Sequence, residues 1–207
     1  MIQDIWPKHL DNQYKNLKPG NEDTVFYFQG SSLLARPSGH FNLQNSEENV
    51  LIYPQYDEFV QGIKSSYGDK AVDNFEFIYL LSIDEEHFFL ARKTGSLERG
   101  TFLGEMADSA VHKDMYSFVR GYEFIGVDSF RKAQPREHAY AAITAFHLYG
   151  WYRDNHFCGR CGKPLKHDDK QRMLRCDCCK NMVFPKICPA VIVAVTDKDR
   201  ILLKIGR

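Results

Sequence analysis

The sequence lacks the features that would place it in a membrane or outside the cell. None of its apolar runs approaches the roughly 20 residues that a membrane-spanning helix needs. Its first residues contain neither the apolar core nor the cleavage site of a secretory signal. Basic and acidic residues balance at 27 each, so no excess charge points to nucleic acid or a membrane surface. These absences predict a cytoplasmic protein.

The sequence also has no internal repeat and no low-complexity tract. Its 207 residues are 43% hydrophobic, which is ordinary for a globular protein and sufficient for a core in one large or two smaller domains.

Residues 1–128 have the pattern of an α+β domain with a mixed sheet and helices. The runs "TVFYFQG" and "SLLARP" predict a hairpin closed by Gly30-Ser31. The run "YDEFVQGIKSSYG" predicts a short helix. The runs "NFEFIYLLSI" and "HFFLAR" predict a second hairpin that turns at Asp84-Glu85-Glu86.

A helix of about twenty residues is predicted for "AQPREHAYAAITAFHLYGWYRD", with Pro135 in its first turn. We interpret His138 and His147 on this helix as structural, because they lie nine residues apart and therefore on different faces. The periodicity places one set of residues on a common apolar face: Ala139, Ala142, Ile143, Phe146, Tyr149 and Gly150.

Five of the six cysteines fall between residues 156 and 186. Cys158-Gly-Arg-Cys161 and Cys176-Asp-Cys-Cys179 form two Cys-x-x-Cys knuckles, and each tight turn can direct two sulfurs at one ion. Four thiolates in a tetrahedron make a closed, structural zinc site with no open position for catalysis. Disulfides and a rubredoxin-like iron site are the alternatives. Zinc is favoured because clustered cysteines in a reducing compartment are usually metal ligands.

The remaining cysteines receive other interpretations. Cys178 lies inside the second knuckle at the wrong spacing for a ligand pair, and we interpret it as a free thiol. Cys188 begins an apolar run and is interpreted as a small hydrophobic residue.

The segment between the knuckles, "KPLKHDDKQRMLR", predicts the β-hairpin arm of a zinc ribbon. Residues 153–180 carry eight Lys or Arg against four acidic residues, which raises the possibility of nucleic-acid binding. No aromatic residues alternate with these basic ones, so we favour a solvated basic face.

The final run, "CPAVIVAVTDKDRILLKIGR", predicts a hairpin that turns at residues 197–200. The stretch "AVIVAV" is apolar on both faces, as in a strand covered from both sides. This hairpin has the pattern of the opening of a domain whose remainder is absent.

The order of these parts resembles the NADH pyrophosphatase branch of the Nudix hydrolases. The resemblance rests on "WYRDNHFCGRCG", the ribbon arm, "MVFPKICPAVIVAV" and "ILLKIGR", and extends from Ser129 to Arg207. It implies an N-terminal domain at 1–128, a connecting strand and helix at 129–155, a zinc ribbon at 156–184 and the start of a Nudix domain at 185–207. Family members cleave NAD(H) to nicotinamide mononucleotide and AMP, some remove NAD caps from RNA, and they are typically homodimers that use Mg²⁺ or Mn²⁺.

The chain departs from this family in lacking a Nudix box. Its one Arg-Glu pair is Arg136-Glu137, and the positions that the box requires around it hold Tyr122, Asp128, Tyr140 and Ala141. The carboxylates that would bind catalytic Mg²⁺ or Mn²⁺ are therefore missing. We predict a truncated chain that is inactive alone and supplies dimer contacts and part of a nucleotide pocket.

Three residues are candidates for substrate contact by this resemblance. Phe184, just before Pro185, takes the place of a family aromatic that packs on the substrate, although it could instead staple the ribbon to the next strand. Arg131 corresponds to an Arg in a short strand ahead of the helix, and Arg36 to a basic group after the first hairpin. Both arginines could instead be surface charges.

Two alternatives to an enzyme fragment remain open. The chain could be a zinc-ribbon binding module that contacts RNA or a protein partner without hydrolase activity. It could also be a folded remnant that only self-associates.

Overall fold

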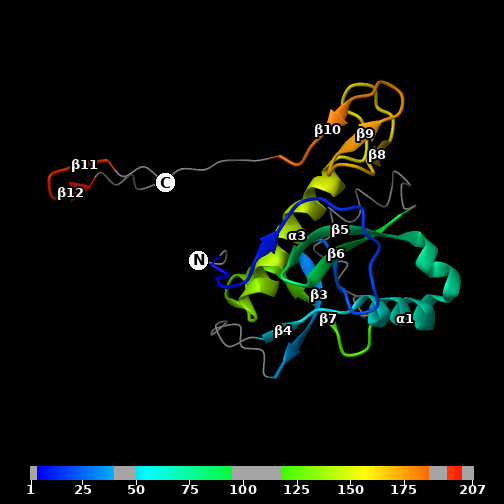
Figure 1. The fold of residues 1–207 in the computed structure, drawn as a ribbon, viewed down its shortest axis with the longest axis horizontal. Coiled ribbons are helices and arrows are strands. Elements are labelled where there is room, and N and C mark those ends of the chain that lie inside the picture. The colour runs from blue at the N-terminus through cyan, green and yellow to red at the C-terminus, as the bar shows by residue number, and fades with distance from the viewer. Residues whose placement is uncertain (1–3, 40–49, 95–117, 187–194, 202–207) are drawn as a thin grey trace.

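The structure is a computed structural model that describes residues 4–39, 50–94, 118–186 and 195–201 (Figure 1). It has the predicted α+β class. A mixed sheet with helices forms the N-terminal part, a long helix follows, and the cysteine-bearing segment forms a small three-stranded unit at the end of that helix.

The main sheet has seven strands in the order β1-β5-β6-β2-β3-β4, and β7 also pairs with β3. Strands β2 and β6 run parallel, while the other pairs are antiparallel. The strands are β1 (Leu10–Asp11), β2 (Thr24–Gln29), β3 (Ser32–Ser38), β4 (Val50–Ile52), β5 (Phe75–Ile83), β6 (Glu86–Lys93) and β7 (Glu123–Gly126).

Both predicted hairpins are present. Strands β2 and β3 join through Gly30 and Ser31, and Gly30 adopts φ +57°, a left-handed conformation that glycine tolerates at no steric cost. Strands β5 and β6 join through Asp84 and Glu85, and their register shifts between Tyr79 and Leu81. This irregularity leaves Leu80 outside the regular ladder.

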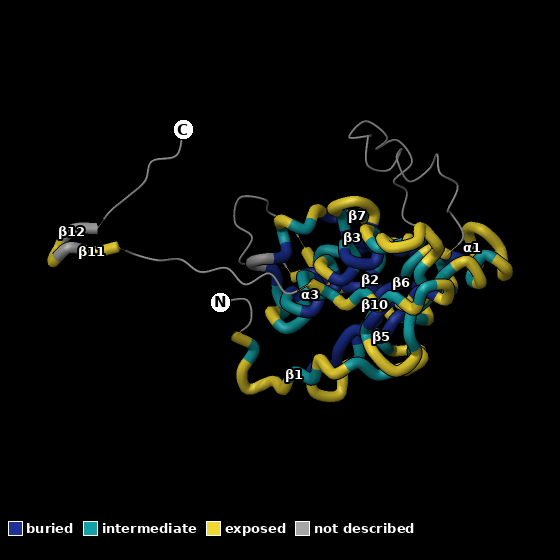
Figure 2. The backbone as a smooth tube through the Cα atoms, turned by 90° about the horizontal axis from the view of Figure 1, so that it is seen from above, coloured by how far each residue is buried: buried dark blue, intermediate teal, exposed yellow. Residues whose placement is uncertain are grey.

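The sheet separates two hydrophobic clusters, because successive side chains of a strand point to opposite faces. Val25 and Leu34 pack with helix α1 (Tyr56–Tyr67). Phe26 and Leu33 pack with helix α3 (Arg136–Asp154). Figure 2 shows the buried backbone concentrated in the central strands and along α3. Each helix therefore covers one face of the sheet.

The buried face of α3 agrees with the predicted one in part, since Ala139 and Ala142 are buried as expected. Its fully buried residues include Ala141 and Ala145, whereas Phe146 and Tyr149 are only partly buried. Small alanine side chains let the helix lie close to the sheet, so the large aromatics flank the contact and pack on its rim. Pro135 immediately precedes the first helical residue and does not lie in the first turn.

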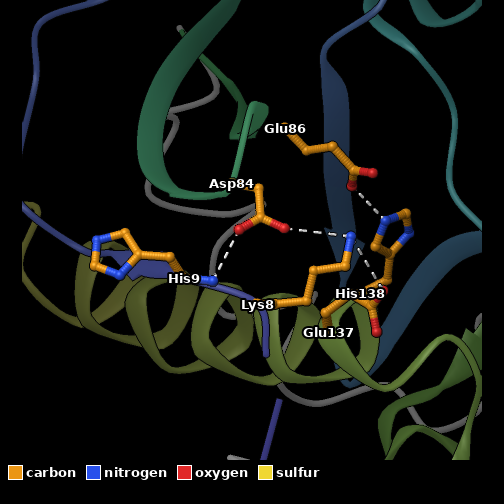
Figure 3. Close-up of polar contacts among 6 residues, drawn as sticks. All are labelled: Lys8, His9, Asp84, Glu86, Glu137 and His138. Carbon is orange, nitrogen blue, oxygen red and sulfur yellow. Dashed lines mark hydrogen bonds and ion pairs between the residues drawn. The ribbon is translucent and has the colours of Figure 1, made fainter. Parts of the chain in front are cut away.

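Polar contacts hold the start of α3 to the β5–β6 turn (Figure 3). His138 Nε2 lies 2.6 Å from Glu86 Oε2. Lys8 Nζ lies 3.4 Å from Asp84 Oδ2 and 3.9 Å from Glu137 Oε1, so it joins the turn to the first helical residues. These contacts agree with a structural role for His138.

Two short 3₁₀ helices complete this part: η2 (Asp69–Asn74) and η4 (Val127–Lys132). The segment ahead of α3 is thus a 3₁₀ helix at residues 127–132, where a strand was expected, and the strand β7 lies before it.

The cysteine-bearing segment, called the ribbon below, spans residues 156–184. It contains β8 (Leu165–His167), β9 (Leu174–Cys176) and β10 (Met182–Val183), with β9 in the centre of an antiparallel sheet. Near the C-terminus, β11 (Thr196–Asp197) pairs with β12 (Arg200–Ile201) around Lys198 and Asp199, as predicted. Cys188 and most of the "AVIVAV" run lie outside the described residues. None of the described helices has the length and apolar character needed to cross a lipid bilayer.

Candidate metal centre

The two knuckles of the ribbon have the same backbone geometry. In the first, Cys158 N–H donates to Lys163 O at 2.7 Å and Gly162 N–H donates to Cys158 O at 2.8 Å. In the second, Cys176 N–H donates to Asn181 O at 2.9 Å and Lys180 N–H donates to Cys176 O at 3.0 Å. Each turn therefore closes on its own first cysteine.

Both turns need a residue in the left-handed region at the same place. Gly162, directly after the first knuckle, has φ +70°, a conformation that glycine adopts at no steric cost. Lys180 occupies the equivalent position in the second knuckle with φ +59°. A lysine carries no sequence signal for this conformation, so the correspondence is visible only in the structure.

The knuckles bring four sulfurs together. The Sγ atoms of Cys158, Cys161, Cys176 and Cys179 all lie within 4.8 Å of one another. Cys158 lies 3.5 Å from Cys179, and Cys161 lies 3.4 Å from Cys176. A tetrahedral ion with metal–sulfur bonds of about 2.3 Å requires sulfur separations of roughly 3.8 Å. The four sulfurs therefore fit one tetrahedral ion of zinc size.

The same distances argue against disulfides. A disulfide holds its sulfurs about 2.05 Å apart, and both close pairs here join different knuckles at 3.4 and 3.5 Å. The described cysteines are all free. Cys178 is exposed and is not among the four clustered sulfurs, in line with its interpretation as a free thiol.

The pKa values of the clustered cysteines and the repulsion between their thiolates favour a bound cation. Burial opposes ionisation of Cys158, but hydrogen bonds from the backbone N–H groups of Arg160 and Cys161 outweigh it and lower the pKa of Cys158 to about 6. The backbone N–H of Lys163 lowers the pKa of Cys161, but its hydrogen bond with Cys176 and burial outweigh this and raise that pKa to about 12. Four thiolates at this spacing repel one another, and a bound divalent cation removes that repulsion.

The basic residues of the ribbon are partly paired with its acidic ones. Lys166 Nζ lies 2.6 Å from Asp177 Oδ2, and Arg175 lies 3.6 Å from Asp168. These pairs agree with the expectation of a solvated face more than with a basic surface open to nucleic acid.

The two candidate substrate residues whose side chains the structure describes lie in different parts of the chain. Phe184 follows β10 in the ribbon and is 49% exposed. Arg36 lies in β3, with its guanidinium 4.9 Å from the centroid of the Tyr122 ring. Figure 1 shows β3 in the main sheet and β10 in the ribbon at the end of α3. Arg131 falls in η4, and its side chain lies outside the described part of the structure.

The structure also shows a polar cleft between the ribbon and the sheet that the sequence did not indicate. It is lined by residues far apart in the chain, among them Tyr14, Arg92 and His167. No sequence motif links these positions, so only the fold reveals them.

Comparison with known proteins gives a partial match. No family model matches the chain. A protein of Pseudomonas aeruginosa (strain LESB58) named NAD-capped RNA hydrolase NudC is 40% identical over 53 residues. Proteins with the same name from Pseudomonas putida (strain W619) and Salmonella typhi are 42% identical over 53 residues and 38% identical over 56.

These matches are short. They cover 26–27% of this chain and 19–22% of the relatives, so the chain spans about a fifth of the length of the curated relatives that it matches. The matches support a relationship between the matched part of this chain and the Nudix NADH pyrophosphatases, in agreement with the family resemblance.

Proposed function

We propose that this chain is the non-catalytic N-terminal and zinc-ribbon portion of an NAD(H) pyrophosphatase. The observation that carries the proposal is the four-sulfur cluster within a ribbon attached to an α+β domain, in a chain similar over 53 residues to NAD-capped RNA hydrolases. The whole enzyme would hydrolyse NADH or NAD to nicotinamide mononucleotide and AMP; on NAD-capped RNA the same cleavage would release nicotinamide mononucleotide and leave a 5′-monophosphate on the RNA.

In this proposal the ion is Zn²⁺ and its role is structural. Cys158, Cys161, Cys176 and Cys179 fill a tetrahedron, so no position remains for a water or a substrate. The ion would hold the two knuckles together and thereby fix the ribbon on the end of α3. The ribbon has short strands and little core of its own, and a structural zinc ion in such a module contributes an apparent 10–16 kcal/mol or so.

The proposed domains follow the sequence: residues 1–128, a connection at 129–155, the ribbon at 156–184 and the start of a Nudix domain at 185–207. Hydrolysis would require the carboxylates of a Nudix box, which the 207 residues do not contain, together with Mg²⁺ or Mn²⁺. We further propose that the chain contributes homodimer contacts and that Phe184, Arg131 and Arg36 contact the dinucleotide.

Among these three, Phe184 has the most direct support. Its ring is half exposed at the end of the ribbon, where a planar base or nicotinamide ring could stack on it.

The proposal is tested by an NADH hydrolysis assay with Mg²⁺ and Mn²⁺ on two proteins. One is the 207-residue chain, and the other is a longer form in which a Nudix domain with an intact box follows Arg207. We expect no turnover by the first and turnover by the second. Phe184→Ala in the longer form should raise KM for NADH by roughly 10-fold or more through lost stacking. Turnover by the 207-residue chain would contradict the proposal that these residues are non-catalytic.

A further inference from the structure

A polar cleft of about 360 Å³ opens where the ribbon meets the edge of the sheet. Its walls come from the segment that follows β1, from the β5–β6 pair and from β8. The polar and aromatic residues that line it include Tyr14, Glu76, Tyr79, Arg92, Lys166 and His167. A volume of this size lies in the range of small-molecule pockets.

Arg172, in the ribbon arm, lies beside this cleft and has no acidic partner among the described residues. One of its terminal nitrogens donates to the backbone O of Leu80, but its Nε is buried and has no hydrogen-bond partner. Its guanidinium carbon lies 5.8 Å from the centroid of the Tyr14 ring, and Tyr14 lines the cleft. Arg172 as a whole is partly buried, and a guanidinium with a buried, unsatisfied donor is costly unless something compensates it.

Two further buried polar groups of this junction also have no hydrogen-bond partner. The Tyr152 side chain is 1% exposed, and its hydroxyl makes no hydrogen bond. The Nε2 atom of His167 is likewise buried and unpaired. His167 packs against both tyrosines, with ring centroids 5.6 Å from Tyr152 and 5.3 Å from Tyr14.

Each of the three unpaired groups can donate a hydrogen bond. The Nε of Arg172 is an obligatory donor and the Tyr152 hydroxyl carries a proton. The Nδ1 of His167 faces the Tyr14 hydroxyl at 3.5 Å. The tautomer that accepts this contact carries its proton on Nε2 and presents a third donor. A ligand that only accepts hydrogen bonds would satisfy all three.

Among the described basic residues around the cleft, Arg172 is the one that has no acidic partner. Arg92 pairs with Glu76 at 2.5 Å, and Lys166 pairs with Asp177 at 2.6 Å. Asp169 lines the cleft but is exposed, so solvent screens its charge. The local balance therefore favours an anion over a cation.

We propose that the junction of ribbon and sheet binds a small phosphate-type oxyanion, with Arg172, Tyr152 and His167 as its donors. The inference is independent of the proposed hydrolase function. Arg172 and Tyr152 do not themselves line the cleft, whereas Tyr14 lines it and lies against Arg172. Tyr14 belongs to residues 12–20, a segment that is not part of any strand, and in this proposal its ring moves aside when the ligand enters.

The test measures thermal unfolding and calorimetric binding of inorganic phosphate, with chloride at equal ionic strength as the reference. The variant Arg172→Met removes the charge and all donors, and the matched control Arg175→Met makes the same change at an exposed position of β9. We expect phosphate to stabilise the wild type and Arg175→Met. Binding to Arg172→Met should weaken roughly 10- to 100-fold, while its stability without phosphate should equal or exceed that of the wild type.

The variant Arg172→Met also controls for general salting-out by phosphate, because salting-out would stabilise this variant as much as the wild type. Tyr152→Phe provides a second, milder variant that removes one hydroxyl and should weaken binding roughly 2- to 10-fold. A nucleoside 5′-monophosphate is titrated in parallel. Tighter binding than inorganic phosphate identifies a phosphate monoester as the ligand, and equal or weaker binding identifies free phosphate. Equal responses of the wild type and Arg172→Met, or no response of the wild type beyond that to chloride, would overturn the proposal.

Discussion

Arg172 of the ribbon donates a hydrogen bond to the backbone carbonyl oxygen of Leu80, the residue where the pairing of β5 with β6 shifts register. The ribbon also contributes Leu174, which is 2% exposed, to the core that α3 shares with the sheet. A polar contact and a buried leucine thus join the metal-binding unit to the N-terminal domain. Binding or loss of the ion at the four sulfurs should therefore affect the packing of the sheet.

Removing the metal should loosen the core around α3. The chain has two tryptophans: Trp6 is 90% exposed, and Trp151 is 8% exposed within the core. In a Trp6→Phe background, we expect a chelator under reducing conditions to shift the Trp151 emission to longer wavelength and to lower the urea midpoint. Binding of the ion only to the folded ribbon supplies the stabilisation that is lost. An unchanged Trp151 spectrum after complete metal removal would show that the ribbon and the core are uncoupled.

A second prediction concerns which thiols bind the ion. Cys176→Ser removes one of the four clustered sulfurs, and Cys178→Ser makes the same change two residues away at an exposed thiol. Elemental analysis should give about one zinc per chain for the wild type and Cys178→Ser, and much less for Cys176→Ser, because a closed zinc site needs all four ligands. Iron in place of zinc would be recognised by its colour and by the same analysis. Equal zinc content in both variants would rule out the four-sulfur site.

The sequence predicted those parts of the molecule that depend on local pattern. The hairpin at Gly30-Ser31 and the Cys158 knuckle follow from spacing and from glycines at turns, and both are present. The buried face of α3 was predicted in part: Ala139 and Ala142 are buried as expected, but Ala141 and Ala145 are buried as well, because small side chains let the helix pack closely on the sheet. The helix is apolar around most of its circumference, so the pattern alone could not orient it.

The cleft beside Arg172 could not be predicted either. It depends on contacts such as that between Tyr14 and His167, which are 153 positions apart in the chain. In the sequence, Arg172 is one of several basic residues on a polar arm. Its partial burial becomes visible only when the arm is seen folded against the bulge at Leu80.

The two glycines within the described helices should respond to alanine in opposite directions. A Cβ at Gly62 in α1 would lie 2.7 Å from the backbone O of Phe118, whereas a Cβ at Gly150 in α3 would meet nothing within 4 Å. Gly150→Ala should stabilise the protein by up to about 1 kcal/mol through higher helix propensity. Gly62→Ala should destabilise it by roughly 1–3 kcal/mol, because backbone must move to relieve the clash. Urea unfolding measures both, and stabilisation by Gly62→Ala would show that Phe118 does not approach α1 this closely.

Stability should also fall on acidification through His167. Burial lowers the pKa of His167 below its usual value of 6.5, so the unfolded state binds the proton more readily than the folded state does. The associated stability is therefore intact above about pH 6.5 and is lost as the pH falls below it. Urea midpoints at pH 7.5 and 5.5 should differ less for His167→Gln than for the wild type. The control is His147→Gln, at an exposed position of α3, which should keep the wild-type difference.

Loss of metal at low pH would lower the midpoint of all three proteins, so the comparison between the two variants isolates the histidine. Because His167 is only partly buried, its share of the acid effect should be smaller than that of a fully buried histidine. A pH dependence of His167→Gln equal to that of His147→Gln would mean that the His167 ring is as well solvated in the folded protein as in the unfolded chain. Its packing against Tyr14 and Tyr152 would then be absent in solution.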